Sequence, residues 1–430
     1  MGAARLFATA LLALVLATPA AAQPIVVPDS GDTAWILVAS ALVLLMTIPG
    51  LALFYGGLVR ARNVLSVVMH CFVMVCTISL LWAAVGYSLV FGEGNAWLGG
   101  TGNAFLANLA ELRSGTTLPE SAFALFQMTF AVITPALVIG AFVERIRFGW
   151  VVAFSLVWTL LVYIPVARSI WGGGWLASLG ALDFAGGIVV HTTAGIAALV
   201  IAVILGARRG FNKTLLPPHS PTLTMVGAGL LWFGWYGFNG GSALSASGDA
   251  ASAILNTHMA ACAAALIWIL LERARIGKAT SIGIVTGAVA GLATVTPAAG
   301  YIGIAGAIAL GTLGGLVCFF AVQLVKQTLK IDDSLDVFAV HGVGGMLGSV
   351  LFPLFMLPSF GGDGFSNDQS LAGQLGAQAL AVGLVAAWTG LATWLFCAAS
   401  KGLLPMRVDE EAEHDGLDLS SHGERGWELD

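Results

Sequence analysis

Long apolar stretches separated by short polar loops occupy most of the sequence between residues 34 and 400. Each stretch is about 20 residues long and lacks the strict alternation of a half-buried strand, so the pattern predicts transmembrane α-helices and not a β-barrel. The predicted spans are 34–57, 64–91, 121–143, 147–166, 185–206, 222–240, 250–271, 279–297, 302–326, 337–358 and 375–400. The pattern predicts an all-α, polytopic membrane protein with eleven transmembrane helices.

The two ends of the chain depart from this pattern. Residues 1–22 combine one basic residue, a short apolar run and a final Ala-Ala-Ala, which predicts a cleaved signal peptide, with an uncleaved extra helix as the alternative. Residues 23–400 then form the transmembrane domain. The polar residues 401–430 are expected to be a cytoplasmic tail, which is either a solvated disordered segment or a docking segment for a cytosolic partner.

Composition supports a lipid-facing surface. Hydrophobic residues make up 58% of the chain and charged residues 10%, whereas a soluble domain carries about 25% charged residues. The net charge of −5 is concentrated in the tail and gives no sign of a nucleic-acid partner. The five cysteines lie in apolar runs without a CxxC pair, so we expect buried hydrophobic side chains and no metal site.

Basic residues divide unequally between the two sides of the predicted bundle. If the mature N-terminus is outside, only Arg113 and Arg168 fall on the outer side, and every other Lys or Arg after the signal peptide falls on the inner side. Cytoplasmic loops are typically rich in these residues. We therefore expect a multi-pass protein of the cell inner (plasma) membrane with a cytoplasmic C-terminus.

A short motif occurs in both the fifth and the tenth span. An aspartate precedes an apolar segment and a Val-His pair, so that Asp183 and His191 correspond to Asp336 and His341. The two copies enter the membrane from opposite sides, and inverted repeats place a substrate path near the midplane.

Ionisable side chains within spans usually face an interior path or a partner. His191 and His341 are best explained as hydrogen-bond partners of each other, with two separately bonded core histidines as the alternative. For His70 and His258, which have no matching copy, the core interpretation is preferred.

Aromatic and hydroxyl side chains indicate a cation site. Phe126 and Phe130 share one helical face, as do Phe238 and Ser242, and Trp171 precedes three glycines in an outer loop. An outer vestibule of rings and one hydroxyl, without a carboxylate, suits a small cation held by cation–π attraction.

Energetics favour a neutral species in the pore. Cation–π attraction contributes about 2 kcal/mol, whereas moving an ammonium-sized ion into a low dielectric costs on the order of 20 kcal/mol in the ideal case and several after relaxation. Neutralising a group with a pKa of about 10.4 at pH 7 costs roughly 4 to 5 kcal/mol. These values favour deprotonation at the vestibule and passage of neutral ammonia, with histidine as a hydrogen-bond partner. The proton either stays outside or crosses separately, in which case histidine can relay it.

The chain resembles the Amt/Mep/Rh ammonium transporters, and within them the bacterial ammonium transporter branch. The resemblance rests on LFYGGLVR (53–60), AFVERIRF (141–148), WGGG (171–174), GALDFAGG (180–187), GFNGGS (237–242), DVFAVHGV (336–343) and the tail segment GLDLSSHGE (416–424). It implies two inverted five-helix halves plus an eleventh helix, a homotrimer with one pore per subunit, no cofactor, and a PII-type signalling protein as partner of the tail.

The same resemblance implies roles for individual residues. It implies an outer ammonium site of Phe130, Trp171 and Ser242, a gate of Phe126 and Phe238, pore residues His191, His341 and Thr296, and a structural role for Asp183 near the site. The alternative function is an ammonium sensor that signals to a cytosolic partner, although sensors of this kind tend to carry an appended signalling domain. A metalloenzyme is disfavoured because no third His or Cys and no intramembrane carboxylate completes a metal site.

Overall fold

The computed structural model describes residues 27–214, 216–365 and 369–427. In these ranges the regular structure is helical, and β-pairing is limited to isolated bridges. The α-helices are α2 (Ser30–Leu45), α3 (Ala52–Leu58), α4 (Val64–Leu81), α5 (Tyr87–Phe91), α6 (Glu120–Val138), α7 (Phe148–Trp158), α8 (Ile164–Ile170), α9 (Trp175–Ser178), α10 (Thr193–Leu205), α11 (Pro221–Gly241), α12 (Gly248–Ile276), α13 (Ser281–Val295), α14 (Ile304–Gln323), α15 (Val343–Leu351), α16 (Leu371–Ser400), α17 (Glu410–Asp415) and α18 (Leu417–His422). The predicted signal peptide at 1–22 lies outside the described residues.

π-Helical turns continue or open several of these helices. They are η1 (Met46–Leu51), η3 (Trp82–Gly86), η6 (Thr159–Tyr163), η7 (Gly187–Thr192), η8 (Leu324–Thr328) and η9 (Phe338–Gly342). Such turns are rare and often occur at functional sites.

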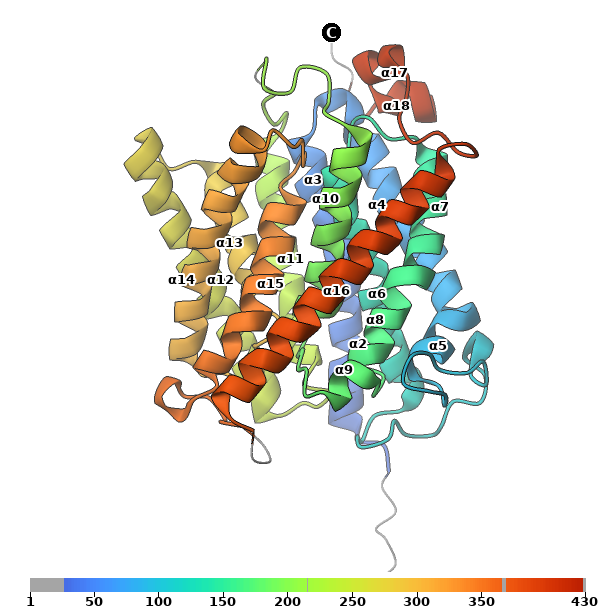
Figure 1. Cartoon of the computed structure of the whole chain (residues 1–430), viewed down its shortest axis with the longest axis vertical. Helices are drawn as coiled ribbons and strands as arrows, with labels where there is room; N and C mark the ends of the chain where they lie inside the picture. The colour runs from blue at the N-terminus through green and yellow to red at the C-terminus, as the bar shows by residue number, and fades with distance from the viewer. Residues whose placement is uncertain (1–26, 215, 366–368, 428–430) are drawn as a thin grey trace, which may run out of the picture.

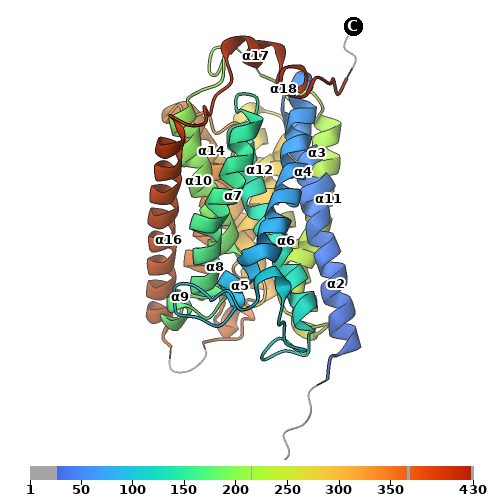
Figure 2. The ribbon, with the colours of Figure 1, turned by 90° about the vertical axis from the view of Figure 1, so that its right-hand side faces the viewer.

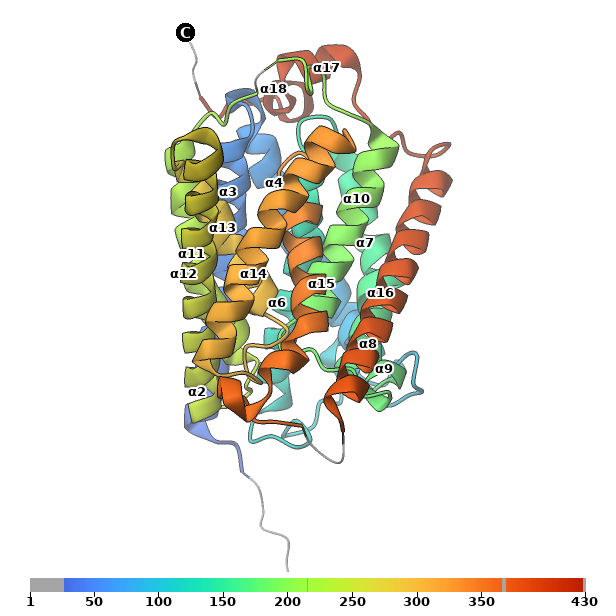
Figure 3. The same cartoon turned by 60° about the vertical axis from the view of Figure 1, so that its left-hand side comes forward.

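The long helices run side by side along one axis, and α16 crosses the outside of the bundle obliquely (Figures 1 and 3). Within the described part of the chain, nine helical segments are long and apolar enough to cross a membrane. The helices α11 and α13 occupy the two remaining predicted positions and pack against α12. The predicted eleven-helix membrane fold is confirmed.

The segments η7–α10 and η9–α15 run in opposite directions. Asp183, just before η7, lines the same cavity as Asp363, which follows α15. Arg208, just after α10, lines the same cavity as Asp336, just before η9. Each histidine-bearing segment therefore begins at the end of the bundle where the other finishes, which confirms the inverted orientation.

Glycine allows these two segments to touch, because a Cβ at Gly195 would overlap the backbone of Gly342. We expect Gly195→Ala to force the segments apart, destabilise the fold by about 1 to 3 kcal/mol, and lower the thermal unfolding temperature in detergent. Gly383→Ala on α16 is the matched control, since a Cβ there meets nothing within 4 Å. Equal unfolding temperatures for the two variants would contradict this packing argument.

The tail packs across one end of the bundle through α17 and α18 (Figures 1 and 2). The Asp418 carboxylate accepts a hydrogen bond of 2.8 Å from the backbone N–H of Ser66 in the first turn of α4, where a negative charge is favourable. The Asn63 side-chain oxygen accepts one of 2.8 Å from the backbone N–H of Leu417. The interpretation as a solvated disordered tail is therefore wrong for residues 401–427.

The cysteines only partly follow the prediction of burial. Cys71, Cys318 and Cys397 are buried, Cys262 is half-buried, and Cys76 is exposed on the outside of the bundle. The prediction is wrong for Cys76 because a surface that faces lipid is as apolar as the core, so an apolar run does not indicate which side faces inward.

Candidate functional site

Three spaces follow one another between the two ends of the bundle. The space away from the tail holds about 550 Å³ and is called the outer cavity. A middle space of about 10 Å³ is called the conduit, and a space of about 250 Å³ on the tail side is called the inner cavity. His341 lines both the conduit and the inner cavity, while the ring of Phe238 in the conduit contacts that of Phe130 in the outer cavity. The three spaces form one pathway that the phenylalanine pair interrupts.

Phe130, Trp171 and Ser242 all line the outer cavity, as the sequence predicts for a common site. The Trp171 ring stands edge-on to Phe130, with centroids 5.6 Å apart, and its Nε1 donates to the Asp183 carbonyl at 2.8 Å, which fixes the ring. The Ser242 hydroxyl donates to the Phe238 carbonyl at 2.9 Å, so its oxygen can still accept a hydrogen bond. Ring faces beside an acceptor oxygen suit a small cation with N–H donors.

The ring pair at the boundary with the conduit is Phe130 and Phe238, whose centroids lie 4.3 Å apart with the ring planes tilted by 32°. The gate of Phe126 and Phe238 stays a prediction, and in the structure the ring that faces Phe238 is that of Phe130. Because α6 and α11 are antiparallel, Phe126 is level with Gly241, and a Cβ at Gly241 would meet the Phe126 ring at 2.7 Å. Phe126 is fully buried and supports Phe130 edge-on, with centroids 5.0 Å apart.

The Asp183 carboxylate caps the π-turn η7. Its Oδ1 accepts hydrogen bonds from the backbone N–H groups of Gly186 and Gly187, and its Oδ2 accepts from Ile188 and Val189, at 2.7 to 2.9 Å. Burial raises the pKa of Asp183, and the four N–H donors oppose this rise. Both carboxylate oxygens therefore bind backbone N–H groups of η7, and Asp183 is only 5% exposed.

The outer cavity also carries charges that the sequence did not predict. Asp249 and Asp363 line it, so the expectation of a vestibule without a carboxylate is wrong. Arg113 lines it too, and its guanidinium lies over the rings of Phe91 and Phe123 at 5.0 and 4.6 Å. No local pattern marks the two aspartates, because one begins α12 and the other lies in the loop after α15.

The two predicted pore histidines meet in the conduit. His191 Nδ1 lies 3.3 Å from His341 Nδ1, the rings are stacked within 12°, and both side chains are buried. When both rings are neutral, two Nδ1 atoms at this distance share one proton, so one ring keeps Nε2 as an acceptor and the other carries a proton on Nε2. The pair therefore offers one donor and one acceptor at its far ends. His191 Nε2 has no hydrogen-bond partner among the described residues.

The conduit is otherwise apolar and lies at the lower limit of space for one water molecule. The walls include Leu51, Ile133 and Leu137. Thr296, predicted as a pore residue, lines none of the three spaces in the described structure. Its hydroxyl instead accepts a hydrogen bond of 2.9 Å from Nε1 of Trp235, a conduit residue, and so positions that ring.

The repeated motif matches Asp183 with Asp336, but the structural counterpart of Asp183 is Asp333. Asp333 stands eight residues before its histidine, as Asp183 does, and accepts hydrogen bonds from the backbone N–H groups of Val337 and Phe338 at 3.0 and 2.7 Å. Asp336 is left without this capping role.

His70 and His258 lie away from the pathway. His258 Nδ1 and the Tyr236 hydroxyl are 2.8 Å apart, as expected for a bonded core histidine. His70 is buried against the Phe148 ring, but neither ring nitrogen has a hydrogen-bond partner among the described residues. The core interpretation is thus incomplete for His70.

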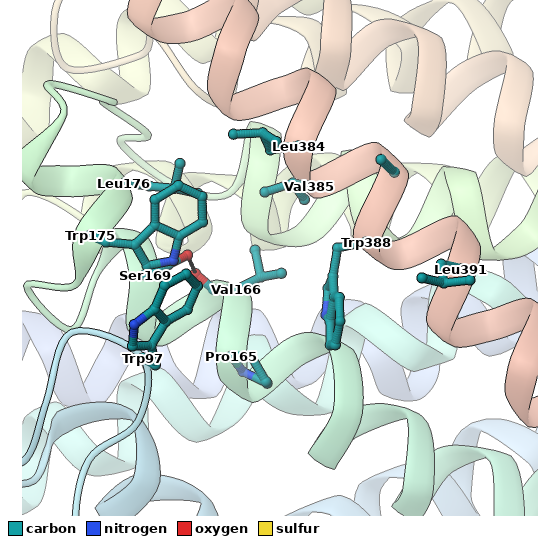
Figure 4. Close-up of a pocket in the computed structure, with 11 residues that line it drawn as sticks. Trp97, Pro165, Val166, Ser169, Trp175, Leu176, Leu384, Val385, Trp388 and Leu391 are labelled. Atoms are coloured by element: carbon teal, nitrogen blue, oxygen red, sulfur yellow. Dashed lines mark hydrogen bonds between the residues drawn. The ribbon is translucent and has the colours of Figure 1, made fainter.

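A separate cavity of about 500 Å³ lies on the side of the bundle between α8, α9 and α16. Figure 4 shows Trp97, Trp175 and Trp388 around it, with Leu384 and Leu391 along α16. The only hydroxyl, that of Ser169, already donates to the Val166 carbonyl. This surface groove holds no group suited to chemistry on a small cation.

Comparison with known proteins identifies the family. Residues 34–427 match the profile of the Ammonium Transporter Family. The ammonium transporter of Bacillus subtilis is 45% identical over 404 residues, which cover 93% of this chain and 98% of that protein. The putative ammonium transporter of Methanothermobacter thermautotrophicus is 44% identical over 407 residues, or 93% and 99%.

Solved structures agree. The crystal structure of Candida albicans Mep2 has a TM-score of 0.83 at 39% identity and covers 89% of this chain and 87% of that one. A structure named Sensor Amt Protein has a TM-score of 0.86 at 30% identity, with coverages of 91% and 98%. The chain therefore belongs to the ammonium transporter family, whose members are membrane transporters and not enzymes.

Proposed function

We propose that the pathway conducts ammonium nitrogen across the membrane as neutral ammonia. NH4+ binds in the outer cavity at Phe130, Trp171 and Ser242, gives its proton to the aqueous phase of that cavity before it passes the phenylalanine pair, and enters the conduit as NH3. The observation that carries this proposal is the conduit itself, because its narrow apolar walls offer hydrogen bonds only through His191 and His341 among the described residues.

The balance of energies supports this order of events. Cation–π attraction of about 2 kcal/mol does not offset the loss of hydration of an ammonium ion, which is several kcal/mol at the least. The carboxylates of Asp249 and Asp363 favour a cation in the outer cavity. Among the described residues, none that lines the conduit is a carboxylate that could stabilise the charge further in. The proton is therefore lost before the conduit.

The histidine pair suits ammonia because ammonia both donates and accepts hydrogen bonds. One Nε2 of the pair donates and the other accepts, as the shared Nδ1 proton requires. The two roles are exchanged when the accepting Nε2 takes up a proton, the shared proton moves from one Nδ1 to the other, and the second ring releases its Nε2 proton. This sequence carries one proton through the pair, so the same pair serves passage of NH3 alone and passage of NH3 with a relayed proton.

We propose that the outer cavity faces the exterior and that the tail lies in the cytoplasm of a cell bounded by this inner (plasma) membrane. Arg60, Arg145, Arg208 and Arg407 gather in ion pairs at the tail end of the bundle, as the cytoplasmic preference of basic residues requires. With residues 1–22 as a cleaved signal peptide, the mature N-terminus lies outside.

The resemblance supports two further proposals, a homotrimer with one pore in each subunit and a PII-type signalling protein as a partner of the tail. The mass of the purified protein, corrected for bound detergent, tests whether it is a trimer. Binding of a purified PII-type protein to the full chain, and loss of that binding when residues 401–430 are deleted, tests the proposed partner.

Ammonium uptake in proteoliposomes tests the proposed function, and the current measured with it shows whether a proton crosses as well. Trp171→Leu removes the ring that lines the outer cavity, so we expect the half-saturating ammonium concentration to rise about tenfold or more, since a desolvated cation–π contact is worth about 2 kcal/mol. Trp388→Leu in the lateral groove is the matched control and should behave as wild type. Equal half-saturating ammonium concentrations for uptake by wild type and Trp171→Leu would contradict the outer site.

A sensor is the second candidate, since Sensor Amt Protein shares this fold. The same proteoliposomes separate the two functions. A sensor would show ammonium-dependent protection of the tail from protease without any ammonium flux, whereas the transporter proposed here shows flux.

A further inference from the structure

The inner cavity contains an ion pair beside the exit of the conduit. Lys326 Nζ lies 2.7 Å from Asp336 Oδ1 and donates a hydrogen bond of 3.3 Å to the Ser334 carbonyl. All three residues line the inner cavity together with His341, which also lines the conduit. Ammonia leaving the histidine pair therefore enters the space that this ion pair borders.

The carboxylate of Asp336 has Lys326 as its charged partner in the described structure. Its Oδ1 is inaccessible to solvent and lies 2.7 Å from Lys326 Nζ, in an ion pair without the alignment of a hydrogen bond. Asp336 also has a backbone φ of 64°, a conformation that is uncommon for a residue other than glycine and that clusters at functional sites. The fold thus places a carboxylate oxygen at the inner cavity without completing its hydrogen bonds.

Other charges at this cavity are already neutralised. The Arg208 guanidinium also lines it, but its nitrogens lie 3.0 Å from Glu144 and 2.9 Å from Asp332. Lys326 and Asp336, with side chains 25% and 21% exposed, are less enclosed than that cluster. A cation in the inner cavity therefore meets Asp336 as the carboxylate whose partner, the partly exposed Lys326 side chain, it can displace.

We propose that Asp336 and the Ser334 carbonyl form an inner ammonium site, which Lys326 occupies as a tethered competitor. The terminal group of lysine is a primary ammonium, so the atoms that hold Nζ are chemically suited to NH4+. Ammonia that leaves the conduit takes a proton from the aqueous phase of the inner cavity, and the ion formed displaces Nζ before release. This inference rests on the proposed function and adds the place where the charged form reappears.

Sidedness provides the test. In inside-out and right-side-out membrane vesicles, Lys326→Gln should lower the half-saturating ammonium concentration for transport that starts at the tail side about fivefold. Asp336→Asn should raise it about tenfold, and Asn is chosen because it tolerates a positive φ. Half-saturation at the opposite side should change less than twofold for both. Lys330→Gln, an exposed lysine in the same loop, is the matched control.

Opposite shifts on the tail side alone support the inner site. An unchanged half-saturating concentration on that side, or equal shifts on both sides, overturns the inner site. If wild-type flux is normal in the same experiment, the proposed function still stands. Absence of wild-type flux would overturn both. If Asp336→Asn does not fold, Lys326→Gln decides, because only a fall on the tail side agrees with a tethered competitor.

Discussion

Replacing His191 or His341 by alanine should reduce ammonium transport roughly five- to hundredfold while the protein still folds. Each change removes an imidazole whose hydrogen bond to ammonia has no substitute in the apolar conduit, and a missing bond of this kind costs about 1 to 3 kcal/mol, with each 1.36 kcal/mol a factor of about ten in rate. Uptake and current measured together in proteoliposomes give the effect on transport and on proton coupling.

A histidine outside the pathway provides the control. His258→Ala removes an imidazole that bonds Tyr236 away from the conduit, so its transport should match wild type. Because His191 and His341 are in contact, their double variant should lose less than the two single losses combined. Unaltered uptake and current in both single variants would remove the pair from the transport pathway.

Asp183→Ala should destabilise the protein most strongly, by roughly 3 to 6 kcal/mol, because an unsatisfied buried donor costs about 1 to 3 kcal/mol. Four backbone N–H groups lose their acceptor together, at the start of the segment that carries His191. The Trp171 ring keeps its acceptor, because that acceptor is the backbone carbonyl of residue 183, so the change acts on η7. Thermal unfolding in detergent and the yield of folded protein from membranes measure the effect.

Asp249→Asn is the control for charge at the same cavity. Its carboxylate is exposed and lines the outer cavity, so we expect stability to stay within about 0.5 kcal/mol of wild type, as is usual for surface substitutions. A wild-type unfolding temperature for Asp183→Ala would show that the four hydrogen bonds do not stabilise η7 as proposed.

Helix number and direction could be predicted from sequence because the bilayer sets both the length of each apolar run and the side on which basic residues collect. The contact between His191 and His341 could be predicted from the repeated motif. The aspartate that corresponds to Asp183 could not be predicted. The sequence motif aligns Asp183 with Asp336, whereas the residue that caps the backbone in the second copy is Asp333.

The details of the site depend on how distant helices align. Spacing along α6 places Phe126 and Phe130 on one face, yet only the antiparallel register against α11 decides that Phe130 meets Phe238. Asp363 and Asp249 reach the outer cavity from segments that follow α15 and begin α12. Tertiary packing, and not local pattern, brings such residues together.

The account depends on a charged ion being excluded from the conduit, and potassium tests this most directly because K+ has no proton to lose. Fluxes of K+ and of ammonium should be measured in the same proteoliposomes under equal gradients. We predict ammonium flux that excess K+ does not reduce more than twofold, and no K+ flux above that of protein-free liposomes. Protein-dependent K+ flux comparable to that of ammonium would contradict passage as neutral ammonia.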